Sequence, residues 1–97
     1  MHAIITLYSG MAGQAGRFTA RRAELETLLL AVPGLVDFRL IETSEGLASL
    51  TVCRDRAACE ECRRRCARWM DTHMPDLAAH VPLIVNGDVI AEALIVG

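Results

Sequence analysis

The sequence predicts an α+β fold of the ferredoxin-like βαββαβ type, in which one antiparallel sheet carries both helices on one face. Two observations predict it. Short β-branched or aromatic runs bounded by glycine and proline alternate with two longer segments whose apolar residues recur at helical spacing. The chain has 97 residues, the size of one small domain with one core. We therefore expect a single domain over residues 1–97.

The first half of the chain is predicted to form a strand, a helix and a hairpin. The run Ala3–Ser9 ends before a glycine and predicts the first strand. Apolar residues at three- and four-residue steps from about Phe18 to Val32 predict the first helix, which a proline–glycine pair ends. Two further strand-like runs, Leu35–Thr43 and Leu47–Cys53, flank a three-residue loop that ends in glycine. Such a loop is typical of an antiparallel hairpin.

The second half predicts a long helix and a last strand. Asp55 begins the helix, which continues to about His73 and ends before a proline. Asn86-Gly87 is a strong turn signal. We therefore expect a short extended piece before this turn and the last strand from about Asp88 to Ile95.

Composition and charge exclude several classes of function. The net charge of −2 gives no basic surface of the kind that binds nucleic acid, so no nucleic-acid partner is expected. No apolar stretch approaches the roughly 18 residues that cross a bilayer. The first strand-like run has no basic segment before it and no cleavage site after it, unlike a signal peptide. A cytoplasmic protein with no membrane contact is the expectation.

All four cysteines lie between Cys53 and Cys66. On a helix, Cys59, Cys62 and Cys66 share one face with Met70 and His73, which is the pattern of a buried stripe. The outer two of these three thiols lie seven residues apart, about 10 Å along a helix axis, too far to share one metal ion. Core packing is therefore favoured over a metal site, and also over a redox pair formed by Cys59 and Cys62.

Two other patterns suggest chemistry but favour ordinary structure. The glycines at 10, 13 and 16 follow a strand and precede a helix, yet their spacing matches neither nucleotide-binding glycine motif. A flexible connection is favoured there. Six arginines crowd the second helix among acidic residues, as in an anion-binding face or a salt-bridged surface. The salt-bridged surface is the commoner outcome.

One histidine and one tryptophan form the candidate site. His73 lies four residues after Trp69 on the apolar side of the second helix, so their rings are expected to be neighbours. A histidine there suits a general base or a haem ligand, whereas the structural alternative is a helix-end residue that contacts the last carbonyls. Tyr8, at the end of the first strand, is placed to reach the same cavity.

Several segments resemble the dimeric α+β barrel superfamily, which includes antibiotic biosynthesis monooxygenase-like and stress-responsive barrel proteins. These are "YSG", "LLLAVPGLVDFRLIET", "GLASLTVCRD", "ARWMDTHMP" and "PLIVNGDV". The most specific piece is the helix stop Pro33-Gly34 followed by the aromatic Phe38, and the chain is most similar to small uncharacterised bacterial members. The resemblance implies a homodimer whose two sheets pack face to face. Both faces of the first strand are apolar, yet the helices can cover only one face of the sheet. The residues themselves therefore also indicate that another surface, most simply a second copy of the chain, covers the other face.

The resemblance also implies an activity. It suggests a cofactor-independent monooxygenase-like enzyme for a small apolar or aromatic molecule, with no metal and no cofactor. Tyr8, Phe38 and Trp69 would contact the substrate and His73 would be catalytic. Haem-degrading members resemble the chain in Trp69 and His73, but their first-strand asparagine has no counterpart here. The alternative function is a non-catalytic, small-ligand-binding or stress-responsive barrel protein.

Overall fold

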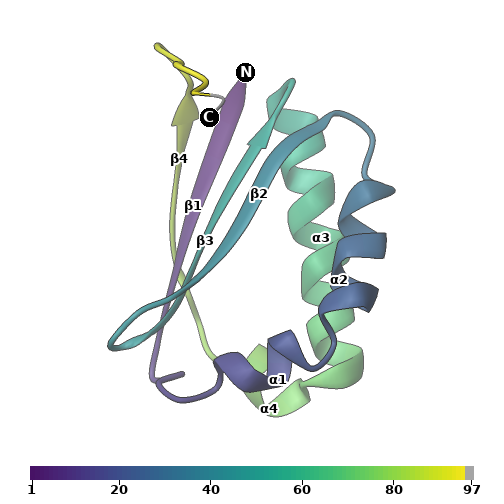
Figure 1. Cartoon of the computed structure of the whole chain (residues 1–97), viewed down its shortest axis with the longest axis vertical. Coiled ribbons are helices and arrows are strands. Elements are labelled where there is room, and N and C mark those ends of the chain that lie inside the picture. The colour runs from purple at the N-terminus through teal and green to yellow at the C-terminus, as the bar shows by residue number, and fades with distance from the viewer. Residues whose placement is uncertain (96–97) are drawn as a thin grey trace.

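A computed structural model describes residues 1–95 of the chain, so the last two residues of the predicted domain lie outside it. Within these residues the order is β1 (His2–Ser9), α1 (Ala15–Thr19), α2 (Arg22–Leu30), β2 (Leu35–Glu42), β3 (Gly46–Cys53), α3 (Arg56–His73), α4 (Pro75–Ala78) and β4 (Leu83–Asp88). The strands form one antiparallel sheet in the order β2-β3-β1-β4, and the helices cover one of its faces (Figure 1). The predicted ferredoxin-like α+β fold is confirmed.

The second predicted helix matches α3 closely. The Asp55 side chain accepts a hydrogen bond from the backbone N–H of Ala58 at 2.8 Å, which caps the helix start. Its buried residues are Cys59, Cys62, Trp69 and Met70, a stripe at helical spacing that faces the sheet. No helix within residues 1–95 has the length and apolarity needed to cross a membrane.

The first predicted helix is divided. A turn at Ala20 and Arg21 separates α1 from α2. The break lets the two helices bury residues in different places: Phe18 of α1 packs near Trp69, whereas Leu29 of α2 packs beside Cys62. One straight helix would carry these two side chains about 16 Å apart along a single axis. The apolar spacing alone did not reveal this division.

The prediction for the last strand is wrong. β4 is the preceding segment, Leu83–Asp88, and it includes the predicted turn residues Asn86 and Gly87. These two residues pair with Ile4 and Ala3 of β1. Gly87 is not among the glycines with positive φ, although the tight hairpin turn typical of Asn-Gly requires such a backbone. Pairing with the long β1 strand therefore overrides the local turn preference.

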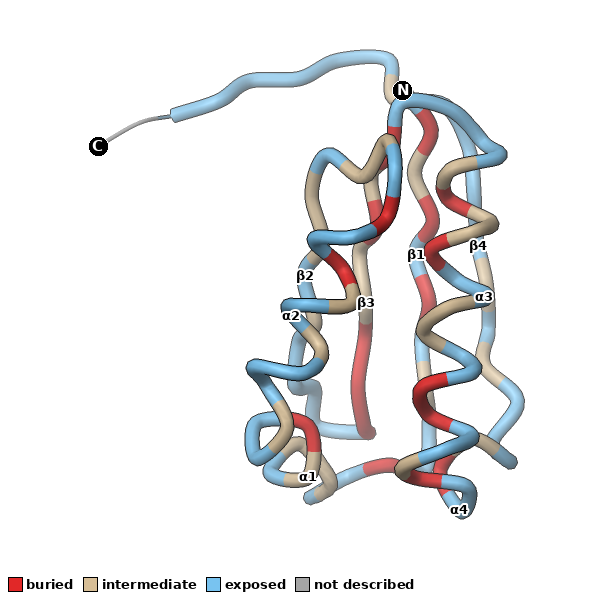
Figure 2. Tube along the Cα trace, turned by 90° about the vertical axis from the view of Figure 1, so that its right-hand side faces the viewer, coloured by how far each residue is buried: buried red, intermediate tan, exposed pale blue. Residues whose placement is uncertain are grey.

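The segment after β4, residues 89–95, lies in no strand and runs away from the body of the molecule (Figure 2). The backbone N–H of Val89 donates to the Met1 carbonyl at 2.9 Å, which continues the contact with β1 by one residue. Beyond it, Ile90, Leu94 and Ile95 are exposed apolar side chains. The predicted strand from Asp88 to Ile95 is thus an exposed tail in the single chain.

The sheet face opposite the helices is uncovered and largely apolar, except for Asp37 and Arg39 of β2. Ile5 of β1 lies opposite Leu50 of β3 and Val85 of β4, while the next outward residue, Leu7, lies opposite Leu83. We call the following set the outer sheet face: Ala3, Ile5, Leu7, Ile41, Ala48, Leu50, Val52, Leu83 and Val85. Ile5 is 45% exposed and Val85 is 54% exposed, so this face lacks the cover that the helices give the other one.

Candidate functional site

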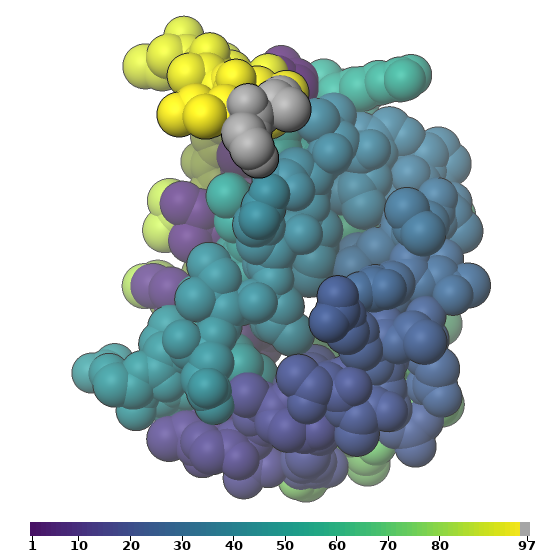
Figure 3. All heavy atoms as spheres, viewed as in Figure 1, coloured from purple at the N-terminus to yellow at the C-terminus, as the bar shows by residue number. Residues whose placement is uncertain are grey.

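A cavity of about 210 Å³ lies between the inner face of the sheet and helix α3. The surface of the molecule is hollowed between the β2–β3 strands and the α1–α2 segment (Figure 3). The cavity wall is mostly apolar, and its larger apolar members are Met11, Phe18, Phe38, Leu40, Leu47 and Trp69. An apolar cavity with a few polar groups is the usual form of a small-molecule site.

Strand alternation places Tyr8 in this wall. Ile4, Thr6 and Tyr8 of β1 all line the cavity, because every second side chain of a strand points to the same face. The end of β1 lies close to β3, where a Cβ on Gly46 would clash with the Tyr8 carbonyl oxygen. Glycine at position 46 therefore permits the close approach that fixes the Tyr8 backbone.

The Tyr8 side chain is a hydrogen-bond donor in this cavity. Burial raises the pKa of the phenol above its usual value, and the nearby Cys66 thiol raises it further, against a lowering effect of Arg63. Tyr8 therefore keeps its proton throughout the physiological pH range. A protonated phenol donates one hydrogen bond to an acceptor on a bound molecule.

Trp69 contributes a second donor. Its side chain is almost completely buried, lines the cavity, and packs with Phe18 at a ring-centroid distance of 6.2 Å. The indole Nε1 is buried and has no hydrogen-bond partner among the described residues. Leaving such a group unpaired costs about 1–3 kcal/mol. A ligand oxygen or a water molecule that accepts this hydrogen bond would recover that free energy.

The structure brings Tyr8, Phe38 and Trp69 together in the cavity wall but leaves His73 outside it. His73 is the last residue of α3 and is partly exposed. Its ring centroid lies 5.3 Å from that of Trp69, and its Nε2 lies 4.0 Å from a Glu24 carboxylate oxygen. The expected contact between the Trp69 and His73 rings is confirmed. The prediction that His73 lines the cavity is wrong. Its catalytic role stays a prediction, and from this position His73 would act through Trp69.

Four exposed residues at the rim of the cavity were not predicted: Arg63, Ala67, Asp71 and His80. The first three follow one another at four-residue steps on α3, so they share one side of the helix. His80 lies after α4, beside Gly10, where a Cβ on the glycine would come within 3.4 Å of the imidazole ring. In the sequence these residues have the spacing of ordinary surface positions.

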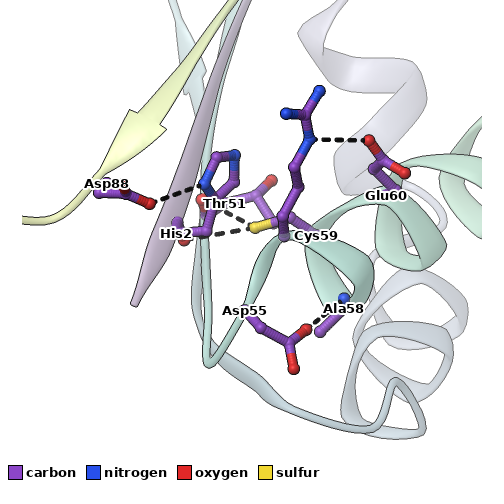
Figure 4. A network of polar contacts seen from close by, with 8 residues as sticks. His2, Thr51, Asp55, Ala58, Cys59, Glu60 and Asp88 are labelled. Atoms are coloured by element: carbon purple, nitrogen blue, oxygen red, sulfur yellow. Dashed lines mark hydrogen bonds and ion pairs between the residues drawn. The ribbon is translucent and has the colours of Figure 1, made fainter.

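The four cysteines divide into two pairs. The Cys59 Sγ contacts the carbonyl oxygens of His2 at 3.3 Å and Thr51 at 3.9 Å (Figure 4). Cys53 is fully buried too, and burial raises the pKa of its thiol to about 12. These two thiols are packed in the core. Cys62 is also packed in the core, beside Leu29 and Val32, but both Cys62 and the half-buried Cys66 line the cavity as well.

Metal-binding side chains do not cluster in the part of the chain that the structure describes. Within residues 1–95, no group of three or more His, Cys, Asp or Glu side chains is arranged to hold a metal ion. The arginines of α3 largely form ion pairs on the surface, for example Arg64 and Arg65 with Glu61 at 2.7 and 2.9 Å. This agrees with a salt-bridged helix surface.

Comparison with known proteins identifies the fold. No protein-family model matches the chain, and no curated protein sequence matches it significantly. Among solved structures, a mutant of MhuD with two manganese protoporphyrin IX molecules bound per active site has a TM-score of 0.71 and 15% identity, with 96% of this chain and 98% of that chain covered. SnoaB, a cofactor-independent oxygenase from Streptomyces nogalater, has a TM-score of 0.63 and 17% identity, with 94% of each chain covered.

A third similar structure is a dimeric ferredoxin-like protein of unknown function from Jannaschia, with a TM-score of 0.61, 19% identity, and 91% of this chain and 97% of that chain covered. Identities this low show the fold alone. They confirm the expected ferredoxin-like α+β fold, which this chain shares with these solved structures. Proteins with this fold thus include a cofactor-independent oxygenase and a protein of unknown function.

Proposed function

We propose that this protein is a cofactor-independent monooxygenase-like enzyme, and that its substrate is a small aromatic molecule with an oxygen substituent. The observation that carries the proposal is the buried, unpaired Nε1–H of Trp69, a residue that lines the apolar cavity. An aromatic ring suits the surrounding aromatic and aliphatic side chains. An oxygen acceptor on that ring suits the buried indole donor.

The two donors suggest how the substrate is activated. Trp69 and Tyr8 both line the cavity. In the proposal, the indole Nε1–H and the phenol hydroxyl both favour negative charge on an oxygen bound between them. An aromatic oxyanion is electron-rich and is itself the reductant of O₂ in a reaction without a cofactor. For 1-naphthol, one O₂ would give one 1,4-naphthoquinone and one water. One oxygen atom enters the ring, and the other leaves with the two hydrogens that the substrate loses.

The proton acceptor is proposed among the histidines. His80 lies at the rim and is exposed, so it can exchange protons with both the cavity and solvent. His73, predicted from the sequence to be catalytic, becomes a positioning residue in this proposal, because its ring packs on Trp69 and it does not line the cavity. Both His73→Ala and His80→Ala should lose turnover, so added imidazole, a diffusible base, separates these roles. Rescue of His80→Ala alone assigns the proton transfer to His80, whereas rescue of His73→Ala alone assigns it to His73.

Haem fits the residues of this cavity less well than a small aromatic substrate does. MhuD, of the same fold, binds a manganese porphyrin, and the resemblance would place a haem ligand at His73. That side chain does not line the cavity here. The asparagine of haem-degrading members is absent from β1, and the one histidine in the wall, His80, is exposed at the rim. The residues of the described cavity therefore do not support haem chemistry.

Paired ligands test the proposed site. Calorimetry should show 1-naphthol binding more tightly than naphthalene, which has the same rings and no oxygen. Trp69→Phe should remove about one hydrogen bond, 0.5–1.5 kcal/mol, and so weaken 1-naphthol binding about 2- to 12-fold. Naphthalene binding should change much less. Equal affinity for the two ligands would contradict the proposed substrate class.

Oxygen uptake separates the enzyme from the alternative, a non-catalytic ligand-binding barrel. Stoichiometric O₂ consumption with 1-naphthol, in protein freed of metals by a chelator, supports the cofactor-independent enzyme. Saturable binding with no O₂ consumption across a panel of hydroxylated naphthalenes and anthracenes supports the binding protein.

We also propose that the protein works as a homodimer in which the outer sheet faces of two copies pack together. The apolar outer sheet face supports this, because soluble monomers rarely expose a contiguous apolar patch of more than a few hundred Å². A structure of the same fold is a dimeric ferredoxin-like protein, which favours the same arrangement. The cavity lies on the other side of the sheet, so it stays accessible in such a dimer.

A further inference from the structure

We propose that Cys66, assisted by Cys62, is a nucleophile in the cavity that adds covalently to a planar α,β-unsaturated carbonyl compound. Both side chains lie in the cavity wall, one helical turn apart on α3. Cys62 is 1% exposed and Cys66 is half-buried, so Cys66 is the thiol that an entering molecule meets. Cys53 and Cys59 are fully buried in a different cluster and do not line the cavity.

The unpaired indole of Trp69 is an independent indication of the ligand. Trp69 follows Cys66 by three residues on the same helix, a rise of about 4.5 Å. Its Nε1–H needs an acceptor, and the carbonyl oxygen of a conjugated ketone or imide is one. A molecule of one or two rings would span the two positions, with its carbonyl at Trp69 and its conjugated double bond near Cys66. The hydrogen bond also withdraws electron density from the double bond, which favours attack by the thiolate.

The neighbouring thiol supplies the activation. The neighbouring Cys62 thiol lowers the pKa of Cys66, and this effect outweighs the opposing effect of burial. The influence of Cys66, together with burial, raises the pKa of Cys62, which therefore stays protonated. Other charged or titratable groups in the wall are Tyr8, Arg63, Asp71 and His80. Of these, Arg63 is the cation that follows Cys62 directly on α3.

The step is an addition and needs no oxidant or reductant. The Cys66 thiolate attacks the β-carbon, a sulfur–carbon bond forms, and the π electrons of the double bond move onto the carbonyl oxygen as an enolate. Hydrogen bonding from Trp69 stabilises that oxyanion. The α-carbon then takes a proton from Cys62 or water. The adduct therefore contains all the atoms of the thiol and of the unsaturated carbonyl compound, and nothing leaves. This chemistry uses the proposed cavity but does not depend on oxygenation, so failure of O₂ uptake leaves it standing.

N-phenylmaleimide is a suitable probe, because it is a planar aromatic Michael acceptor that cannot redox-cycle. Intact-protein mass spectrometry of the whole chain should show one fast addition, and peptide mapping should place it on Cys66. Cys66→Ser should abolish the fast addition. Cys59→Ser, which keeps a donor for the His2 carbonyl, should leave the rate unchanged. Thermal melting of each variant confirms that it is folded.

The pH profile tests the part played by Cys62. The rate should reach half its maximum below pH 8.5 or so, the pKa of an ordinary cysteine. Cys62→Ala should move this midpoint upward, and Cys62→Ser should restore it in part, which a purely structural role would not do. Fast modification of Cys53, Cys59 or Cys62 in folded protein, or an unshifted midpoint in Cys62→Ala, would overturn the proposal. Equal rates for N-phenylmaleimide and the non-aromatic N-ethylmaleimide would overturn the aromatic recognition.

Discussion

Replacing Ile5 by aspartate tests the proposed dimer at the centre of the outer sheet face. In the single chain, Ile5 is 45% exposed, while its neighbour Ile4 is 5% exposed and packs under the helices. The two residues therefore offer the same chemical change on opposite faces of one strand. We expect Ile5→Asp to give a folded monomer or a weakened dimer. Ile4→Asp should unfold the chain, because it places a carboxylate in the core.

The magnitude follows from burial and symmetry. A fully buried isoleucine contributes about 1.5–3 kcal/mol, so covering the exposed part of Ile5 contributes about 0.7–1.4 kcal/mol per copy. A two-fold interface contains the substitution twice, which doubles this loss and brings two carboxylates together. An uncompensated buried charge costs several kcal/mol more. A total loss above about 4 kcal/mol weakens the dimer by about a thousandfold.

Sedimentation velocity or light scattering over a micromolar concentration series measures the effect. Leu30→Asp is the matched control, because Leu30 is 88% exposed on α2 and lies away from the outer sheet face. The control should stay dimeric. A well-folded monomer of the unmodified chain, or an Ile5→Asp variant that dimerises like the control, would refute the role given to the outer sheet face.

Three further predictions follow from single residues. His73→Ala should keep its far-ultraviolet circular dichroism but lose turnover of any substrate found; undiminished turnover would make His73 purely structural. Cys62→Ala should lower the free energy of unfolding by the order of 1 kcal/mol in a denaturant titration, and elemental analysis should find no stoichiometric zinc; one metal ion per chain would contradict core packing. The Arg17 guanidinium lowers the pKa of Asp76 from 3.8 to about 2. Because this folded-state pKa is depressed, the stabilisation is present above pH 3.8 or so and is lost as the pH falls through 2. The stability difference between the unmodified chain and Asp76→Asn should therefore vanish near pH 2, and a difference that grows there would contradict the pairing.

Local chemistry was enough to predict most of the fold. Asp55 has the side chain of a helix cap, and α3 begins one residue after it. The glycine at the end of a three-residue loop predicted the hairpin, and β2 and β3 pair as expected. These features depend on residues close together in the sequence. The strand β4 does not: both Leu83–Asp88 and the following segment are apolar, and only pairing with β1 decides between them.

The site could be predicted only in part, for a related reason. Helical spacing was enough to place Trp69 on the apolar side of α3, and the position of Tyr8 at the end of the first strand placed it near the cavity. Because both faces of that strand are apolar, alternation alone did not show which face points inward. The same spacing placed His73 on the apolar stripe, but α3 ends at that residue and the ring comes to lie partly exposed beyond Trp69. His80 follows a four-residue helix that was not predicted, and its place at the rim depends on contacts across the chain.

The indole signal of Trp69 shows whether the buried donor binds the substrate oxygen, because the chain contains one tryptophan and so gives one indole N–H resonance. A proton–nitrogen correlation spectrum of labelled protein should be recorded during titration with 1-naphthol and, separately, with naphthalene. With 1-naphthol, we expect a downfield shift of the indole proton and slower exchange with solvent, as its hydrogen bond forms. Naphthalene should perturb the backbone amides of cavity residues without that downfield shift. An indole proton that stays in place while 1-naphthol perturbs those amides would contradict the account, since the buried donor would then have no part in binding.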